Sequence, residues 1–367
     1  MNRLWWKQIR AVIRLEMKKT FFAKRGIWIY LLALAPLVLF AGHAIETARH
    51  RQALVRLISQ NEKPLAEQDF AAITPGMAQE EVVERLGNPP VRNSWKARRR
   101  TGPDSIDVFM REQYHYGAGQ SEFFVEIEHG KVAAIHRRQE GCDFGQDSII
   151  FASVFQFFYL RLAIFFGCLG IFMNLFRGEL LDKSLHFYFL APIRREIVMI
   201  GKYLAGLIAA TIIFTTSTAL QMVALGWHFD PNALSTYLYQ NHGLAHATAY
   251  LGVTALACLG YGSFFLAAGL LFRNPIWPAA AILLWEGLNP FLPSLLKKLS
   301  VIYYLKSLCP VEIPVGPGVP PVFALLVSNA DPIAAPLAVF GVITVALAIL
   351  LASSYQVRRM EINYTTE

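Results

Sequence analysis

The segment RGELLDKSLHFYFLAPIRREIVMIGKYLAG, residues 177–206, separates two of the most apolar stretches of the chain. The whole chain of 367 residues is 54% hydrophobic and only 16% charged, whereas soluble domains carry about 25% charged residues. Several apolar runs reach the roughly 20 residues that a helix needs to cross a bilayer. The sequence therefore predicts an α-helical integral membrane protein.

Six apolar runs are long enough to be membrane spans. The first is followed by five more within residues 148–357, so that we place spans at residues 27–46, 149–176, 197–226, 244–272, 275–295 and 333–356. Many Lys and Arg residues precede the first run, and such cations hold that end of a span in the cytoplasm. Because six is an even number, the tail at residues 358–367 returns to the cytoplasm as well.

The amino-terminal segment, residues 1–26, mixes apolar and cationic side chains. The apolar ones are Trp5, Trp6, Ile9, Ile13 and Met17. This pattern predicts an amphipathic helix that lies on the cytoplasmic face of the membrane. A basic tail that only sets the orientation of the first span is the alternative.

Residues 47–147 differ from the rest, because they are rich in Arg, Glu, Asp and Gln. About 100 residues suffice for one small domain. Within it, ITPGMAQEEVVERLGNPP predicts a helix that begins after Thr74 as N-cap and ends at Gly87. Strand-like segments follow, two of them joined by a turn at His129 and Gly130. We therefore expect a small α+β domain, inserted outside the cytoplasmic membrane.

This domain resembles the small outer-membrane-assembly lipoproteins of the SmpA/OmlA type. The matching residues are Gly76, Met77, Val82, Leu86, Gly87, Pro89 and the Gly-Lys-Val at 130–132. The resemblance implies a helix with a three-stranded sheet, a periplasmic location and contact with an envelope protein. The lipid-anchor cysteine of those proteins is absent here, and a membrane span stands in its place.

The charged interruption at residues 177–191 has the pattern of a short interfacial helix. Leu180, Leu181, Leu185 and Phe189 can share one face, and Pro192 ends the helix. Lys202 lies in the next span, where we expect its side chain to extend back to the interface. A solvated turn between two spans is the alternative interpretation.

The same segment resembles the permease subunits of type 2 ABC exporters. The resemblance rests on Gly178-Glu179, Leu185, the Leu-Ala-Pro at 190–192, Arg194, Glu196 and Gly201-Lys202. It implies a coupling helix that docks on a separate ATPase subunit, an amphipathic elbow, six spans, a broken element before the last span, and a second permease chain, identical or different. The implied coupling residues are Gly178, Glu179, Asp182, Leu185, Pro192, Arg194 and Glu196. The chain departs from the family at Lys183-Ser184, where Gly-Thr is usual, and in the size of its insert.

The chain has no Walker A motif of its own. The Gly-Lys pairs at 130–131 and 201–202 lack the upstream glycine and the following Ser or Thr. We therefore expect no catalytic residue, cofactor or metal on this chain, and ATP hydrolysis on a partner. The alternative function is a non-transporting scaffold or sensor in the bacterial inner membrane, whose outer domain binds an envelope protein.

Two charges fall inside the predicted spans, and an ionisable side chain there is costly unless it is paired. Arg161 and Glu286 lie at comparable depth, so we expect them to pair. The pair is either a structural clamp or part of a substrate or gating site; alternatively, Arg161 lies at the outer interface. A disulfide between Cys142 and Cys309, both outside the bilayer in this topology, remains an open alternative.

Overall fold

The computed structural model describes residues 3–22, 26–100, 106–139, 144–181, 193–272, 274, 276–314 and 333–359. The chain divides into two compact units. The first, which we call the bundle, comprises Met1–Ala41 and Phe144–Glu367, and the second, which we call the sheet domain, comprises Gly42–Asp143. The long helix α2 (Ile27–Gln60) contributes residues to both.

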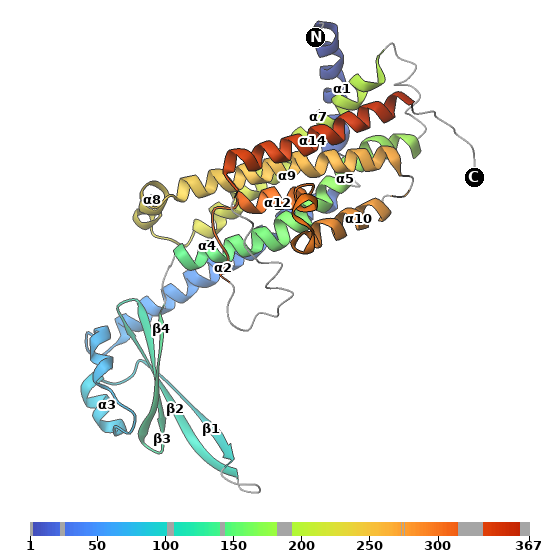
Figure 1. Cartoon of the computed structure of the whole chain (residues 1–367). Helices are drawn as coiled ribbons and strands as arrows, with labels where there is room; N and C mark the ends of the chain where they lie inside the picture. The colour runs from blue at the N-terminus through green and yellow to red at the C-terminus, as the bar shows by residue number, and fades with distance from the viewer. Residues whose placement is uncertain are drawn as a thin grey trace. The chain divides into compact units, whose positions relative to one another are not determined.

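The bundle is entirely helical over its described residues (Figure 1). Besides the first part of α2, its elements are α1 (Arg3–Phe22), α4 (Phe144–Val154), η3 (Phe155–Ala163), α5 (Ile164–Leu181), α7 (Arg195–Gly226), α8 (Pro231–Gln240), α9 (Gly243–Leu271), α10 (Ile276–Gly287), η4 (Asn289–Phe291), α11 (Ser294–Lys297), α12 (Val301–Ser307) and α14 (Ala335–Arg359).

Among the described residues, five helical segments are long and apolar enough to cross a membrane. They are Ile27–Gln60, Phe144–Phe176, Arg195–Gly226, Gly243–Leu271 and Ala335–Arg359. The chain is thus a membrane-spanning helical protein, as the composition predicts.

The span predicted at residues 275–295 takes a different form. Its helix, α10, has 12 residues, and at about 1.5 Å per residue it reaches only about 18 Å. The hydrocarbon core of a bilayer is about 30 Å thick. The helix ends at Gly287, and the chain continues through Pro290 in η4 and Pro293 before α11. These helix-breaking residues divide an apolar run that hydropathy alone reads as continuous.

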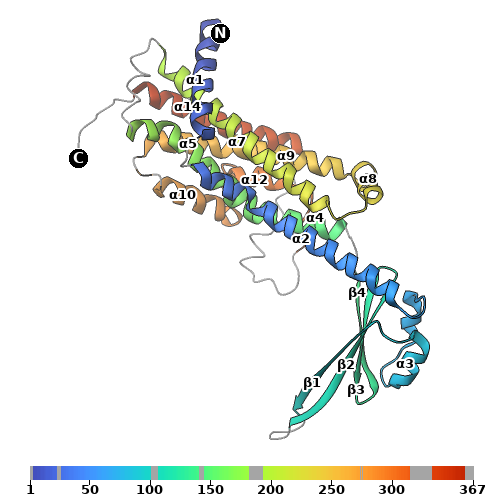
Figure 2. The ribbon, with the colours of Figure 1, turned by 180° about the vertical axis from the view of Figure 1, so that it is seen from behind.

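Helix α9 is central to the bundle, since it packs against α5, α7, α8, α12 and α14. Figures 1 and 2 both show α7, α9 and α14 side by side, with α8 at one end and α1 at the other. Close packing depends on glycines in α9. A Cβ on Gly262 would lie 2.5 Å from the ring of Phe172, and one on Gly269 would lie 3.2 Å from the backbone of Met173.

The sheet domain holds four antiparallel strands in the order β1-β2-β3-β4. The strands are β1 (Val91–Arg100), β2 (Ile106–Ala118), β3 (Ser121–Glu128) and β4 (Lys131–Gln139). Besides the second part of α2, the 3-10 helix η2 (Glu67–Ala72) and the helix α3 (Gln79–Leu86) supply its helical structure. Their side chains share a core with alternate residues of β3, including Phe123 and Val125.

This core is built around aromatic side chains. Phe70 of η2 stacks on Phe123 with ring centroids 3.8 Å apart. Tyr116 is fully buried, and its hydroxyl donates a hydrogen bond of 2.9 Å to the carbonyl of Gly87. Burial raises the pKa of Tyr116 well above that of a free tyrosine. The hydroxyl therefore stays protonated and fastens the end of α3 to the sheet.

Two details of the sheet domain differ from the sequence prediction. Helix α3 begins at Gln79 with Ala78 as N-cap rather than after Thr74, because the preceding backbone pairs with β4. The amide of Gly76, at a φ of 94°, donates to the carbonyl of Val132 over 2.8 Å. Strand β1 was not expected either, since its side chains at residues 91–98 are almost all exposed and show no alternation.

Candidate functional site

Residues of the predicted coupling motif lie at the amino-terminal end of α7. Arg194 occupies the N-cap position and Glu196 the first turn. The guanidinium of Arg194 lies over the ring of Trp5 in α1, 5.3 Å from its centroid. The carboxylate of Glu196 forms an ion pair with Arg358 near the end of α14. Helices α1, α7 and α14 therefore meet at this point, which we call the α7 junction.

The junction depends on a close approach between α1 and α7. A Cβ placed on Gly201 would lie 2.9 Å from the Cβ and Cγ1 of Val12. Glycine at this position lets the two helices cross in direct contact. Ile9, Val12 and Glu16 are the buried residues on the α1 side, spaced three and four apart as one helical face requires.

Lys202 is the residue next to this crossing, and its side chain has no exposed surface. Its Nζ donates to Oε1 of Glu16 over 2.8 Å and to the carbonyl of Leu175 over 2.9 Å. The ring of Phe176 lies 5.5 Å away. The expectation that Lys202 reaches back to the interface is wrong, because Glu16 supplies a compensating charge within the protein. The buried pair joins α1, α5 and α7.

Sequence reasoning identified Lys202 but missed Glu16. The available signal was that Glu16 is the only acidic residue within the basic segment 3–22. A single acid among many cations on an amphipathic helix is a candidate partner for an unexplained lysine in a nearby span. Of the apolar residues named from the sequence of α1, Ile9 is buried, Trp5, Ile13 and Met17 are half-buried, and Trp6 is exposed.

The other predicted coupling residues are only partly described. Gly178 and Glu179 belong to α5, which continues without interruption to Leu181. The side chain of Glu179 and the residues Asp182, Leu185 and Pro192 lie outside the described residues.

Glu286, the acidic member of the predicted intramembrane pair, lies at the end of α10 and is 6% exposed. Its carboxylate caps helix α12. Oε1 accepts the amide of Val301 over 3.0 Å, while Oε2 accepts the hydroxyl of Ser300 and the amide of Ile302, both over 2.8 Å. Glu286 thereby satisfies amides at the start of a helix that have no intrahelical acceptor.

Arg161, the basic member, lies in η3, which is a stretch of π-helix. Its guanidinium interacts electrostatically with Glu286 and with Tyr261 of α9. Lys306 of α12 lies close enough to interact with Arg161 as well. The structure thus places Arg161 and Glu286 within electrostatic range of each other, inside a polar cluster that connects η3, α9, α10 and α12. π-helical segments are frequent at functional sites.

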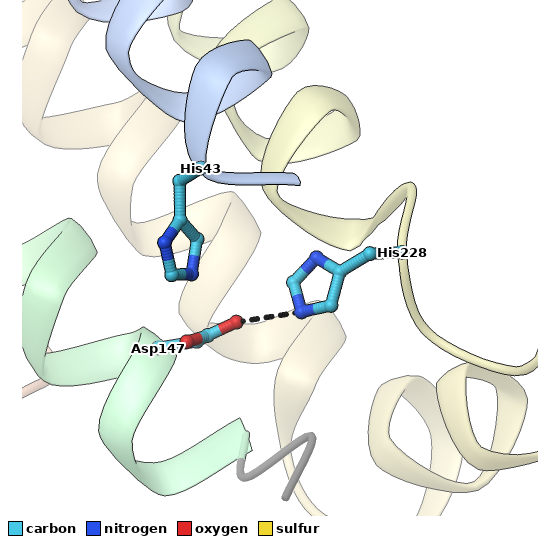
Figure 3. A group of neighbouring side chains, drawn as sticks. All are labelled: His43, Asp147 and His228. Atoms are coloured by element: carbon cyan, nitrogen blue, oxygen red, sulfur yellow. Dashed lines mark ion pairs between the residues drawn. The ribbon is translucent and has the colours of Figure 1, made fainter. Parts of the chain in front are cut away.

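A third pair of ionisable groups lies toward the end of the bundle away from the α7 junction. Asp147 of α4 and His228, just after α7, form an ion pair of 3.1 Å between Oδ2 and Nε2 (Figure 3). The His228 side chain is 1% exposed. Neither residue is marked by a local pattern in the sequence, because each stands alone at the end of an apolar run.

These features define a membrane-spanning helical protein with a small α+β domain and buried ion pairs between its helices. No protein-family model, curated protein or solved structure matches the chain in the comparisons made. Function is therefore inferred from the geometry of the chain.

Proposed function

We propose that the chain is the membrane-spanning permease subunit of an ABC exporter, driven by a separate ATPase subunit. The observation that carries the proposal is the α7 junction, where Glu16 and Lys202 join α1 to α7 beside Arg194 and Glu196. An ATPase that moves a cytoplasmic segment can drive transport only if the movement is transmitted to the membrane spans. The contacts of the α7 junction provide a path for this movement.

The contacts at the α7 junction determine which helices would move together. Separating Glu16 from Lys202 would leave a buried charge without compensation, which is strongly unfavourable. The helices α1 and α7 therefore move together. Helix α14 packs on α7 and is also linked to it by the partly exposed ion pair between Glu196 and Arg358. A push on the segment 177–196, which includes the proposed coupling helix 177–191, would displace three helices at once and change how they pack against α9.

The proposed topology has six crossings, with the element α10–α12 as the fifth. Helices α9 and α14 pack together and run in the same direction (Figure 1). The chain between them has to return to the opposite end of the bundle. The segment containing α10, η4, α11 and α12 makes this return in short pieces, which is tolerated at membrane depth where protein buries it. Glu286 holds two of these pieces together.

In this proposal the protein lies in the inner membrane of a bacterium with both termini in the cytoplasm. The sheet domain, 47–147 in the sequence prediction, is then periplasmic and available to an envelope protein. The permease works as a dimer with a second permease chain, identical or related. ATP is bound and hydrolysed on the partner subunit, so Arg194 and Glu196 couple motion and take no part in catalysis.

The test is co-purification of the tagged full chain from its own membranes in mild detergent, with bound proteins identified by mass spectrometry. We expect a P-loop ATPase with the wild type, and its loss in the Glu179→Lys/Arg194→Glu variant. Arg85→Glu, an exposed charge reversal in the sheet domain, is the matched control and should retain the ATPase. Size-exclusion profiles establish that both variants are folded.

Two results would contradict the proposal. If no P-loop ATPase accompanies the wild type, the transport function is wrong. If only envelope proteins are recovered, and deletion of residues 47–147 removes them, the chain is a scaffold or sensor. A recovered ATPase should also hydrolyse ATP faster in liposomes that contain the wild-type chain than in liposomes that contain the double variant.

A further inference from the structure

A pocket lies between α4, α7, α8 and α9 at the end of the bundle away from the α7 junction, with a volume of about 110 Å³. One wall is a stack of three aromatic rings. Phe144 lies between Phe229 and Tyr237, with centroid distances of 3.7 and 4.4 Å and interplanar angles of 12° and 7°. Such a wall offers flat apolar surface on which a ring or chain can pack.

The pocket lining also includes two buried polar atoms that have no hydrogen-bond partner among the described residues. Tyr250 of α9 is 3% exposed, and its hydroxyl has no hydrogen-bond partner among the described residues. A backbone group of Val311 lies near the hydroxyl but outside hydrogen-bond geometry. His246 lies one helical turn earlier, and within the described chain its buried Nδ1 also lacks a partner. Buried polar groups are nearly always hydrogen-bonded, so a pair of exceptions on one pocket wall needs an explanation.

The charge of the pocket limits what it can hold. Asp147 lines it, but its carboxylate is paired with His228. The remaining polar groups that face the pocket, including Tyr250 and Ser148, are uncharged. A ligand with a net charge would find no opposite charge that is not already compensated, so the pocket suits a neutral molecule.

We propose that this pocket binds a neutral amphiphile through a hydroxyl group that bridges Tyr250 and His246, while its apolar body lies on the stack at Phe144. A hydroxyl both donates and accepts, which satisfies the two polar atoms whichever tautomer His246 adopts. A closed cavity of about 150 Å³ holds one benzene molecule. This pocket is smaller but open on one side, so a single ring can enter it while part of the ligand stays outside. The site is independent of the proposed transport function.

The test uses two fluorinated probes, 4-fluorophenol and fluorobenzene, which differ by the hydroxyl group. The full chain is placed in lipid nanodiscs, and saturable binding is measured by fluorine NMR against empty nanodiscs. We expect the wild type to bind 4-fluorophenol more tightly than fluorobenzene. In Tyr250→Phe, 4-fluorophenol should bind about fivefold more weakly, as expected for the loss of one hydrogen bond, while fluorobenzene should bind no more weakly than to the wild type.

Two further variants control for partition into lipid and for loss of fold. Tyr203→Phe removes a hydroxyl that donates to the carbonyl of Leu259 outside the pocket, and it should bind both probes as the wild type does. Ala247→Trp fills the pocket and should abolish saturable binding of both. The proposal is wrong if the wild type binds neither probe saturably, which would mean that the pocket holds water only. Equal affinity for the two probes, or an unchanged preference in Tyr250→Phe, would also overturn it.

Discussion

A buried ion pair of the bundle and an exposed ion pair of the sheet domain differ in what they contribute to stability. In the sheet domain, Arg85 and Glu81 of α3 pair at the surface, where both side chains are nearly half exposed. In the bundle, the Lys202–Glu16 pair has exposures of 0% and 4%. Both are single contacts between a cation and a carboxylate over 2.8 Å. Only their surroundings differ.

This difference shows what an ion pair does in each solvent. Water stabilises the separated charges of an exposed pair almost as well as the pair itself. A lone charge that is buried between packed helices has no such alternative, so the partner becomes obligatory. An ion pair between a cation and a glutamate is therefore nearly neutral for stability at the surface and acts as a crosslink when it is buried. The predictions below test this contrast, from the largest effect to the smallest.

Glu16→Ala should have the largest effect, because it leaves the buried ammonium of Lys202 without its carboxylate. Removing one partner of a buried pair costs about 3–5 kcal/mol of unfolding free energy. A large fall in the thermal unfolding midpoint of the detergent-solubilised chain is the expected readout. The double variant Glu16→Leu/Lys202→Met removes both charges and should recover most of the loss. If the double variant is as unstable as the single one, the charge argument fails and packing of α1 is the cause.

Glu286→Ala removes the acceptor for two amides and one hydroxyl at the start of α12. Leaving a buried donor without a partner costs about 1–3 kcal/mol. The loss should be local, so hydrogen exchange of the amides of Val301 and Ile302 should accelerate while exchange within α9 remains slow. Glu312→Ala, at an exposed position after α12, is the control. Uniform acceleration across the bundle would mean that Glu286 has a wider role than capping α12.

Gly201→Ala tests whether the contact between α1 and α7 is as tight as its geometry indicates. The added methyl group would meet Val12 at 2.9 Å, and overpacking of this kind costs about 1–3 kcal/mol. Gly252→Ala in α9 is the matched control, since nothing lies within 4 Å of its Cβ, and alanine is the better helix former. In detergent, the thermal unfolding midpoint should fall for Gly201→Ala and should rise slightly for Gly252→Ala. Equal midpoints would show that α1 yields to the added methyl group.

The sequence could predict features that arise from neighbouring residues. The apolar runs predicted the five long helices. The pair His129-Gly130 predicted a hairpin turn, and both residues adopt the positive φ that such a turn requires. The sequence did not predict the contact between Lys202 and Glu16, which are 186 positions apart, because no local pattern specifies that they meet. Arg161 and Glu286 could be matched because both are charges at comparable depth within predicted spans. The division of residues 275–295 was missed because hydropathy averages over the prolines that interrupt the helix.

The smallest effect is expected for Arg85→Ala, which removes the surface ion pair with Glu81 one turn earlier on α3. Exposed pairs at this spacing contribute roughly 0.3–0.5 kcal/mol. Arg85 also donates to the carbonyl of Ala72 over 3.3 Å, a long and exposed contact that adds little. Hydrogen exchange of the α3 amides in the full chain should change by less than about threefold, and added salt should reduce the difference further. A loss as large as that of Glu16→Ala would contradict the comparison, because it would mean that the sheet domain depends on its surface charges as the bundle depends on its buried ones.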